Sequence, residues 1–228
     1  MIRTVRSFMA YILGVSGGVG CGKSAVLDYL EEHADARIIK SDECTHEMML
    51  PGAPAYGPLV RLLEEEGKRE DSAPLLDSEG VIDRREMAAR IFGNDSLRQK
   101  VNSILHPAVM EYLSEEAEKE RNSSIHEFFV VEAALLIENR FGETADEMWY
   151  IYCDEKERRR RLKESRGYSD EKIDSIMAAQ LSEEEFRAGT DVTIDNSGSI
   201  EDTRSQVERE LFRIRKGGGK RRGSGEFL

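Results

Sequence analysis

Five short hydrophobic runs stand out along a chain that is otherwise rich in charged residues. Runs of this length with polar flanks are typical of buried strands. Helix-like stretches separate them, and this alternation predicts an α/β fold in which helices cover both faces of a five-stranded parallel sheet. The five runs are Tyr11–Val15, Ala36–Lys40, His126–Val131, Met148–Cys153 and Val192–Asp195.

Apolar residues at helical spacing mark four longer helices between and after these strands. Asn94 to Ser96 is a typical N-cap for the third helix, and Pro107 is expected to end or kink that helix. The interval 43–125 is too long for a simple crossover, so we expect a helical insertion there that forms one wall of a substrate site. The four helices are about Tyr56–Glu66, Arg84–Phe92, Ser96–Glu120 and Ser199–Ile214.

A glycine-rich segment directly after the first run carries the clearest chemical signal. Residues 17–24 read Gly-Gly-Val-Gly-Cys-Gly-Lys-Ser and match G-x-x-x-x-G-K-[ST], between a predicted strand and a predicted helix. In such a P-loop the glycines let backbone N–H groups point at phosphate oxygens, Lys23 reaches the β- and γ-phosphates, and the Ser24 hydroxyl ligates Mg²⁺. We therefore expect a three-layer P-loop NTPase fold that binds ATP. The residues expected to contact the nucleotide are Gly18, Val19, Gly20, Cys21, Gly22, Lys23, Ser24 and Ala25.

The composition limits the kinds of binding partner and the cellular compartment that we expect for this chain. The chain of 228 residues is long enough for one α/β domain with insertions, and its net charge of −12 argues against nucleic acid as a general partner. Its three cysteines show no C-x-x-C spacing, which favours a reducing cytoplasm over a disulfide framework or a zinc site. No apolar run approaches the length of a membrane span.

The two ends of the chain need separate interpretation. Arg3 and Arg6 before the first apolar run faintly resemble a signal peptide, but the same run supplies the first strand, so we expect no secretion. Met9 is an alternative start for the same reason. The basic, glycine-rich segment 216–228 is expected to be a disordered tail, with contact to an anionic partner as the alternative.

Acidic residues follow the second and third hydrophobic runs. Asp42 lies just past a predicted strand end, where open α/β sheets bind their ligands. Its carboxylate can take a proton from an acceptor hydroxyl or help position Mg²⁺, or it can cap a helix that begins near Thr45. Glu132 can hold a water on Mg²⁺, or it can be a solvated strand end.

A basic cluster follows the fourth run and contains Arg158–Arg161, Lys163 and Arg166. At helical spacing the four consecutive arginines cannot all face one way, so one or two can reach ATP phosphates as part of a lid. The others are expected to pair with nearby acids, namely Asp154, Glu155 and Glu157. Elsewhere His106, beside apolar residues, either lines a substrate pocket or is structural.

Two functional classes fit these features: a small-molecule kinase, and an ATP-dependent switch that acts on a macromolecular partner. A guanine-binding [NT]-K-x-D motif is lacking, and the third run ends in Val-Val-Glu rather than in the apolar run plus Asp of a typical ATPase. An arginine-rich lid and a helical insertion suit a compact kinase, which must enclose both substrates and exclude water.

Further motifs make the interpretation more specific. Asp42 stands nine residues before Pro51-Gly52, as in a D-x8-P-G segment, and four more segments follow in family order from about Tyr11 to Phe212. Together they resemble the dephospho-CoA kinase family. The segments are Leu105-His106-Pro107, Glu132–Glu138, Ala178-Ala179-Gln180 and Asp191–Gly198.

The resemblance implies that ATP donates its γ-phosphoryl group to the ribose 3′-hydroxyl of dephospho-CoA, with Mg²⁺, to give CoA and ADP. It implies a general base at Asp42, catalytic roles for Lys23 and Arg161, and metal contacts from Ser24 and Glu132. Arg166 is the other match to the lid arginine of the family. The residues assigned to the substrate side are Ser16, Asp42 and His106.

The implied layout is one kinase domain over residues 9–215. Its core is 9–42, 126–153 and 190–215, its CoA-side insertion is about 43–125, and its lid is about 154–189. We expect dephospho-CoA and ATP as substrates and a monomer with at most weak self-association, without nucleic acid or membrane. A related nucleoside or nucleotide kinase is the alternative within the class.

Some positions depart from the family pattern. Ala25 stands where threonine is common, and Thr190 precedes Asp191 where alanine is common. Glu132 stands where aspartate is common, so this longer acid would have to reach the metal from further back. Ala134 replaces a common proline.

Overall fold

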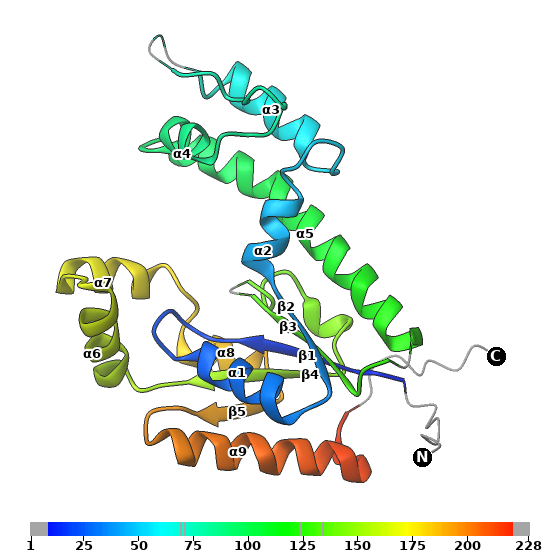
Figure 1. Cartoon of the computed structure of the whole chain (residues 1–228). Helices are drawn as coiled ribbons and strands as arrows, with labels where there is room; N and C mark the ends of the chain where they lie inside the picture. The colour runs from blue at the N-terminus through cyan, green and yellow to red at the C-terminus, as the bar shows by residue number, and fades with distance from the viewer. Residues whose placement is uncertain (1–8, 69, 71, 124, 134, 221–228) are drawn as a thin grey trace. The chain divides into compact units, whose positions relative to one another are not determined.

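The computed structural model describes residues 9–220 apart from 69, 71, 124 and 134 (Figure 1). The chain divides into two compact units, one of Met1–Ile39 with Glu116–Leu228 and one of Lys40–Glu115. The second unit corresponds to most of the expected insertion, but it begins before Asp42 and ends inside the long helix α5 (Asp95–Ser123). Ala134 and the residues from 221 onward lie outside the described residues.

The first unit is built on a five-stranded sheet with the order β2-β3-β1-β4-β5. Strand β1 pairs in parallel with β3 and β4, and β4 pairs in parallel with β5. The predicted α/β fold with a five-stranded parallel sheet is confirmed. The strands are β1 (Tyr11–Ser16), β2 (Ala36–Lys40), β3 (Phe128–Glu132), β4 (Glu147–Tyr152) and β5 (Val192–Asp195).

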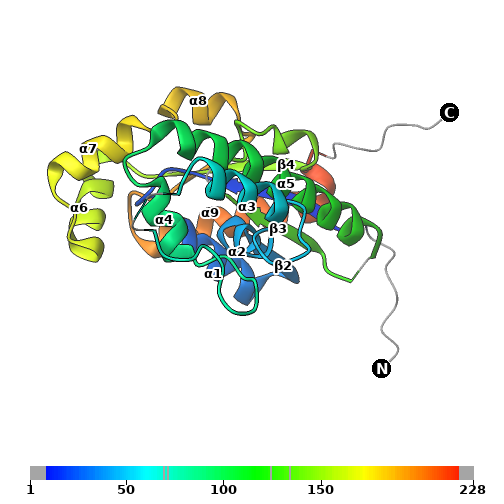
Figure 2. The same ribbon diagram turned by 90° about the horizontal axis from the view of Figure 1, so that it is seen from above.

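Helices cover both faces of this sheet, which explains why its central strands, β3, β1 and β4, are buried along almost their whole length. Helices α1 (Lys23–His33) and α9 (Ile200–Arg213) pack on one face, where Leu30 and Val207 are fully buried against Trp149. Figure 2 shows α1 and α8 (Glu183–Ala188) on opposite sides of the sheet.

The carboxyl ends of the strands carry the glycine loop, which joins β1 to α1. Helices α6 (Glu155–Arg166) and α7 (Asp170–Ala178) follow β4 and project from this end of the sheet (Figures 1 and 2). A short 3₁₀ turn, Phe141–Glu143, precedes β4. The fold therefore brings the predicted lid and the glycine loop to one end of the first unit.

The last part of α5 (Asp95–Ser123) is anchored in the first unit by buried ion pairs. Arg121 donates to both carboxylate oxygens of Asp146 at 2.9 and 3.0 Å, and Asp146 also accepts from the Ile12 N–H at 2.8 Å. Arg37 donates to Glu116 and Glu120. Buried charges are tolerated here because each has a hydrogen-bonded partner of opposite sign.

The second unit contains α2 (Ser41–Glu47), α3 (Tyr56–Glu65), α4 (Arg84–Ile91) and the first part of α5. The buried side chain of Arg90 holds its helices and loops together. It donates to the carboxylates of Glu86 and Glu64 and to the carbonyls of Leu63 and Ala73, at 2.8 to 3.0 Å.

Two expectations for α5 have different outcomes. The N-cap is confirmed, since Asn94 Oδ1 accepts from the Leu97 N–H at 3.0 Å. We expected Pro107 to end or kink the helix; an end there is excluded, because the helix continues to Ser123, and the kink stays a prediction. Leu105, Val109, Leu113 and Ala117 are buried at four-residue spacing, so packing outweighs the hydrogen bond that proline removes.

The end of the described chain differs from the expected tail. Helix α9 is followed by a π-helical turn, Ile214–Gly218, and Lys220 contacts the first unit. The Lys220 ammonium lies 2.6 Å from an Asp191 oxygen, and the Lys220 carbonyl accepts from the Tyr11 hydroxyl at 2.8 Å. The first five residues of the predicted tail therefore have defined structure.

Candidate active site

The glycine loop keeps its shape through backbone conformations that suit only glycine. Gly20 and Gly22 have φ of 84° and 83°, in the left-handed region. A Cβ atom at Gly22 would collide with the Asn196 amide, and one at Gly20 would meet Leu162 of α6 at 2.9 Å. The loop is thus packed closely between α6 and the residues after β5, and it leads directly into α1.

The side chain of Lys23 lies across the loop that precedes it. Its ammonium group donates to the Gly17 carbonyl at 2.9 Å and lies 3.3 Å from Glu132 Oε1. Both side chains are mostly buried, and Glu132 ends β3 beside Val15 of β1. A cation is therefore held beside the glycine loop, and the backbone amides of such a loop are the groups that bind phosphate oxygens.

The four consecutive arginines of α6 form two pairs that contact different partners. Arg159 pairs with Glu155 and Asp174, and Arg160 pairs with Glu157 and Glu164. The expected pairing of outward arginines with Glu155 and Glu157 is confirmed, whereas Asp154 instead caps α6 by accepting from the Glu157 N–H at 2.9 Å. Arg158 and Arg161, three residues apart and therefore on one face of the helix, contact the glycine loop and the segment after β5.

Arg161 is joined to the loop through Asn196. It donates to the Asn196 carbonyl at 2.9 Å, and the Asn196 amide donates to the Cys21 carbonyl at 2.7 Å. Thr203 of α9 donates to Asn196 Oδ1 at 2.8 Å, which fixes the orientation of the buried amide. Arg166, the other match for the lid arginine, lies over the ring of Tyr168 instead.

Arg158 and Gln180 form a second connection to the loop, which our sequence-based site assignment missed. Gln180 Oε1 accepts from the Val19 N–H at 3.2 Å and from Arg158 Nη2 at 2.7 Å. Arg158 Nε donates to the Val19 carbonyl at 3.2 Å. The sequence signals were the Ala178-Ala179-Gln180 motif and the three-residue spacing of Arg158 from Arg161.

Three other predicted site residues, Ser16, Ser24 and Ala25, flank the glycine loop in the sequence. Ser16 ends β1, and its buried hydroxyl has no hydrogen-bond partner among the described residues. The exposed Ser24 lies in the first turn of α1, directly after the glycine loop. The Ala25 N–H donates to the Gly22 carbonyl at 3.1 Å, so this amide is already used within the turn.

Asp42 is exposed in the first turn of α2, in the second unit. The helix begins at Ser41 rather than near Thr45, with Lys40 at its N-cap, so Asp42 is not the capping residue. Among the described residues no hydrogen bond or ion pair engages its carboxylate. A free, solvated carboxylate of this kind can accept a proton.

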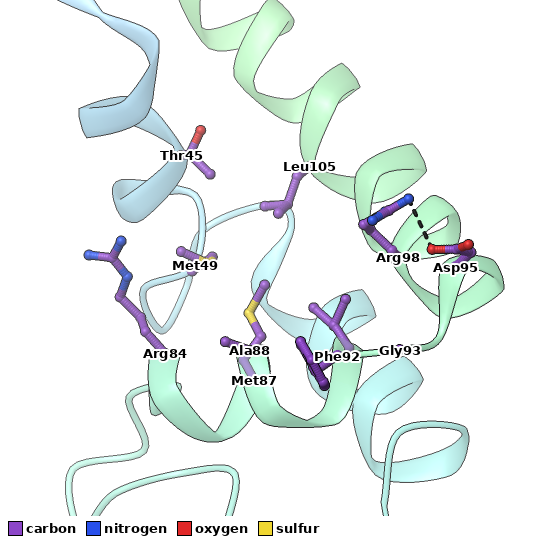
Figure 3. A pocket seen from close by; sticks show the side chains of 11 residues that line it. Thr45, Met49, Arg84, Met87, Ala88, Phe92, Gly93, Asp95, Arg98 and Leu105 are labelled. Atoms are coloured by element: carbon purple, nitrogen blue, oxygen red, sulfur yellow. Dashed lines mark ion pairs between the residues drawn. The ribbon is translucent and has the colours of Figure 1, made fainter. Parts of the chain in front are cut away.

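The second unit contains a cavity of about 680 Å³ (Figure 3). Met49, Met87 and Leu105 line it, with Arg84 on one side and the Arg98–Asp95 ion pair, at 3.0 Å, on the other. Leu105 lines this cavity, whereas the half-buried His106 does not.

The three cysteines are buried, and none forms a disulfide. Burial raises the pKa of the Cys21 thiol, and it raises the pKa of Cys153 to about 11. Both thiols are therefore neutral at physiological pH, so Cys21 serves the loop through its backbone rather than as a nucleophile. Within the ranges that the structure describes, three or more His, Cys, Asp or Glu side chains nowhere gather to hold a metal ion. Nor does any helix there have the length and apolar character to cross a membrane.

A phosphate-binding glycine loop with its lysine, arginines from a helix after β4, and a parallel sheet beneath them define a P-loop kinase. The family model for dephospho-CoA kinase matches residues 11–202, and the chain belongs to this family. The kinase class predicted from the sequence is therefore confirmed.

Curated relatives and solved structures agree with this assignment. A dephospho-CoA kinase of Carboxydothermus hydrogenoformans is 36% identical over 86% of this chain and 90% of its own length. One from Geobacter sulfurreducens is 32% identical, over 86% of this chain and 95% of its own length. The structure of a dephospho-CoA kinase from Campylobacter jejuni, 22% identical, has the same fold, with a TM-score of 0.68 over 90% of this chain and 98% of that one.

Proposed function

We propose that the protein transfers the γ-phosphoryl group of ATP to the ribose 3′-hydroxyl of dephospho-CoA, giving CoA and ADP. The assignment of dephospho-CoA as the acceptor rests on the match to dephospho-CoA kinases along nearly their whole length. The donor side is supported by the glycine loop and by Lys23 held at 2.9 Å from the Gly17 carbonyl.

On the donor side, the amides of the loop bind the phosphates, and Lys23 exchanges its contacts with Gly17 and Glu132 for phosphate oxygens. Arg161 stabilises the negative charge that develops on the transferred group. Its tie to Asn196, and through it to Cys21, keeps the guanidinium near the loop without a large reorganisation.

For magnesium, the oxygen donors of Ser24 and Glu132 fit a hard divalent cation, which prefers one or two protein oxygens together with substrate phosphates. Glu132 Oε1, 3.3 Å from the Lys23 ammonium, supplies a carboxylate beside the phosphate site. When bound, Mg²⁺ would neutralise part of the phosphate charge. The Lys23–Glu132 ion pair orients both side chains before ATP enters.

On the acceptor side, we assign Asp42 as the general base. The 3′-oxygen of the ribose bonds to the γ-phosphorus, its proton passes to the Asp42 carboxylate, and ADP leaves with the bridging oxygen. Ser16 and His106 are assigned to the substrate side. The second unit would bind the CoA end, and its cavity, with apolar Met49 and Met87 and flanking arginines, suits an amphipathic chain.

The test is ADP release with dephospho-CoA, AMP, adenosine and shikimate as competing acceptors. We expect turnover of dephospho-CoA with a kcat/KM at least 100-fold above the other three. Turnover of a different acceptor alone would overturn the assignment, and ATP hydrolysis that needs a protein partner would favour an ATP-dependent switch.

We also propose a cytoplasmic, monomeric enzyme whose partners are its two substrates. Three buried cysteines that form no disulfide support a reducing compartment. The net charge of −12 supports the expectation that nucleic acid and anionic membranes do not attract the chain.

A further inference from the structure

Gln180, Arg158 and Val19 form a closed ring of hydrogen bonds at the glycine loop. The Val19 N–H donates to Gln180 Oε1, Arg158 Nη2 donates to the same oxygen, and Arg158 Nε donates to the Val19 carbonyl. Both backbone polar groups of one loop residue are thus held by side chains from the lid segment. Gln180 lies in the connection between α7 and α8, so the ring joins three separate parts of the first unit.

The ring needs close approach to the loop. A Cβ atom at Gly18 would collide with Arg158 Nη2 and would lie 2.9 Å from Gln180 Oε1. Any side chain at this position would push both groups away. Gly18 therefore gives room for an arginine against the phosphate-binding backbone, in addition to its role in the turn.

Arg158 differs from its three neighbours in the charge of its partners. Arg159, Arg160 and Arg161 each pair with at least one carboxylate. The hydrogen bonds of Arg158 to described residues go to neutral oxygens, those of Gln180 and Val19. Its positive charge is therefore not neutralised, and its Nη1 group has no partner among the described residues.

Gln180 suits this arrangement because its acceptor oxygen is uncharged. It fixes the arginine by a hydrogen bond of 2.7 Å without placing an anion beside incoming phosphates. A carboxylate in its place would hold the arginine as well, but it would cancel the charge and repel ATP.

We propose that Gln180 is a positioning residue that holds Arg158 against the glycine loop, so that a second lid arginine, besides Arg161, is in place when the triphosphate binds. This inference rests on the proposed function. Arg158 then stabilises charge on the transferred phosphoryl group, and Gln180 acts only through Arg158. The restraint matters because an arginine side chain otherwise loses rotamer freedom on reaching the phosphates.

The test is a double-mutant cycle with Gln180→Ala, Arg158→Gln and the double variant, each assayed for kcat and for KM of both substrates. We expect each single variant to lose at least about tenfold in kcat, since an arginine at a transferring phosphoryl group contributes strongly to its rate. We expect the double variant to be no slower than Arg158→Gln alone, with the KM of dephospho-CoA unchanged within twofold. Arg159→Gln, on the outer side of the same helix, is the matched control and should leave kcat unchanged.

Gln180→Glu separates positioning from charge. Its oxygens keep Arg158 in place but offset its positive charge, so kcat should fall about as far as in Gln180→Ala, and only in Gln180→Glu should the KM of ATP also rise, at least about threefold, through repulsion. Losses that multiply in the double variant, or an unchanged kcat in Gln180→Ala, would overturn the proposal.

The outcome is distinguishable from failure of the proposed function. Wild-type turnover of dephospho-CoA tests that function by itself, and the slow hydrolysis of ATP without acceptor gives the same cycle a readout that needs no acceptor. Thermal unfolding of all variants within about 2 °C of wild type would show that folding is intact. Multiplicative losses in ATP hydrolysis contradict the role of Gln180 whatever the acceptor proves to be.

Discussion

At the scale of single residues, the environment of Asp42 separates it from the other acids near the ends of strands. Glu132 lies 3.3 Å from Lys23 and is mostly buried, whereas Asp42 is exposed and engages no described residue. A carboxylate that is neither paired nor buried is accessible to an acceptor hydroxyl and can take its proton during the reaction. The two acids are thus suited to different tasks.

Replacement of Asp42 by asparagine tests its task directly. The amide cannot accept the proton of the 3′-hydroxyl, so kcat should fall by roughly 10²–10⁴-fold, while the dissociation constant of ATP stays within about twofold. Steady-state kinetics and titration with a fluorescent ATP analogue measure the two quantities. Glu43→Gln, exposed in the same turn of α2, is the matched control. Asp42→Asn with a wild-type kcat would remove the residue from the mechanism.

How far the sequence predicts the site depends on whether contacts are local. Lys23 and Ser24 follow from the motif because their roles lie within eight consecutive residues. Gln180 and Asn196 meet the loop 161 and 175 residues away along the chain. Their motif positions are visible in the sequence, but which loop amide or carbonyl each one contacts depends on how β4, β5 and the lid are arranged.

At the scale of elements, the strands were predicted within a few residues, and the differences have physical causes. Strand β4 begins at Glu147, one residue before the expected hydrophobic run. This glutamate is buried because Arg213 of α9 donates to both of its oxygens, at 2.6 and 2.8 Å. In a sequence, a charged residue next to a hydrophobic run is taken to mark the end of the strand, because the distant residue that pairs with its charge cannot be identified.

At the C-terminal end of α5, the ionisation of Glu120 makes the stability of the fold depend on pH. Burial disfavours the charged form of Glu120, but hydrogen bonds from His126 and Arg37 outweigh it and lower the pKa of Glu120. A lowered folded-state pKa means that the stabilisation is present above the ordinary pKa near 4.5 and is lost as the pH falls through the lower value.

Glu120→Gln should therefore lower the Tm by several degrees at pH 7, since leaving buried donors poorly satisfied costs about 1–3 kcal/mol. The difference from wild type should shrink as the pH falls from the ordinary pKa near 4.5 through the lower folded-state value, because the wild-type carboxyl then becomes protonated as well. Thermal unfolding followed by circular dichroism at pH 7 and at a series of decreasing acid pH values measures it. Glu111→Gln, exposed on the same helix, serves as control. A Tm difference that stays constant throughout this series would contradict the electrostatic explanation.

At the scale of the whole molecule, the sequence predicted a helical insertion near 43–125, and the structure has a compact unit at Lys40–Glu115. The boundary could not be located from sequence because α5 passes through it without interruption. Neither a proline, a glycine nor a change in composition marks Glu115. In contrast, the glycine loop, Lys23, Arg158, Arg161 and Gln180 all belong to the first unit.

This division predicts which part of the molecule ATP stabilises. A ligand that binds only the folded state at 100 times its dissociation constant adds about 2.7 kcal/mol, which raises the Tm of a chain of this size by about 5–10 °C. Because the residues proposed to contact the nucleotide lie in the first unit, Mg·ATP should shift the transition that includes this unit, and removal of Mg²⁺ with EDTA should abolish most of the shift. Lys23→Ala should abolish it as well, because the phosphates lose their buried cation. Lys172→Ala, exposed on α7, should keep the full shift. Differential scanning calorimetry resolves the transitions, and a full shift that persists in EDTA would show that magnesium has no part in nucleotide binding.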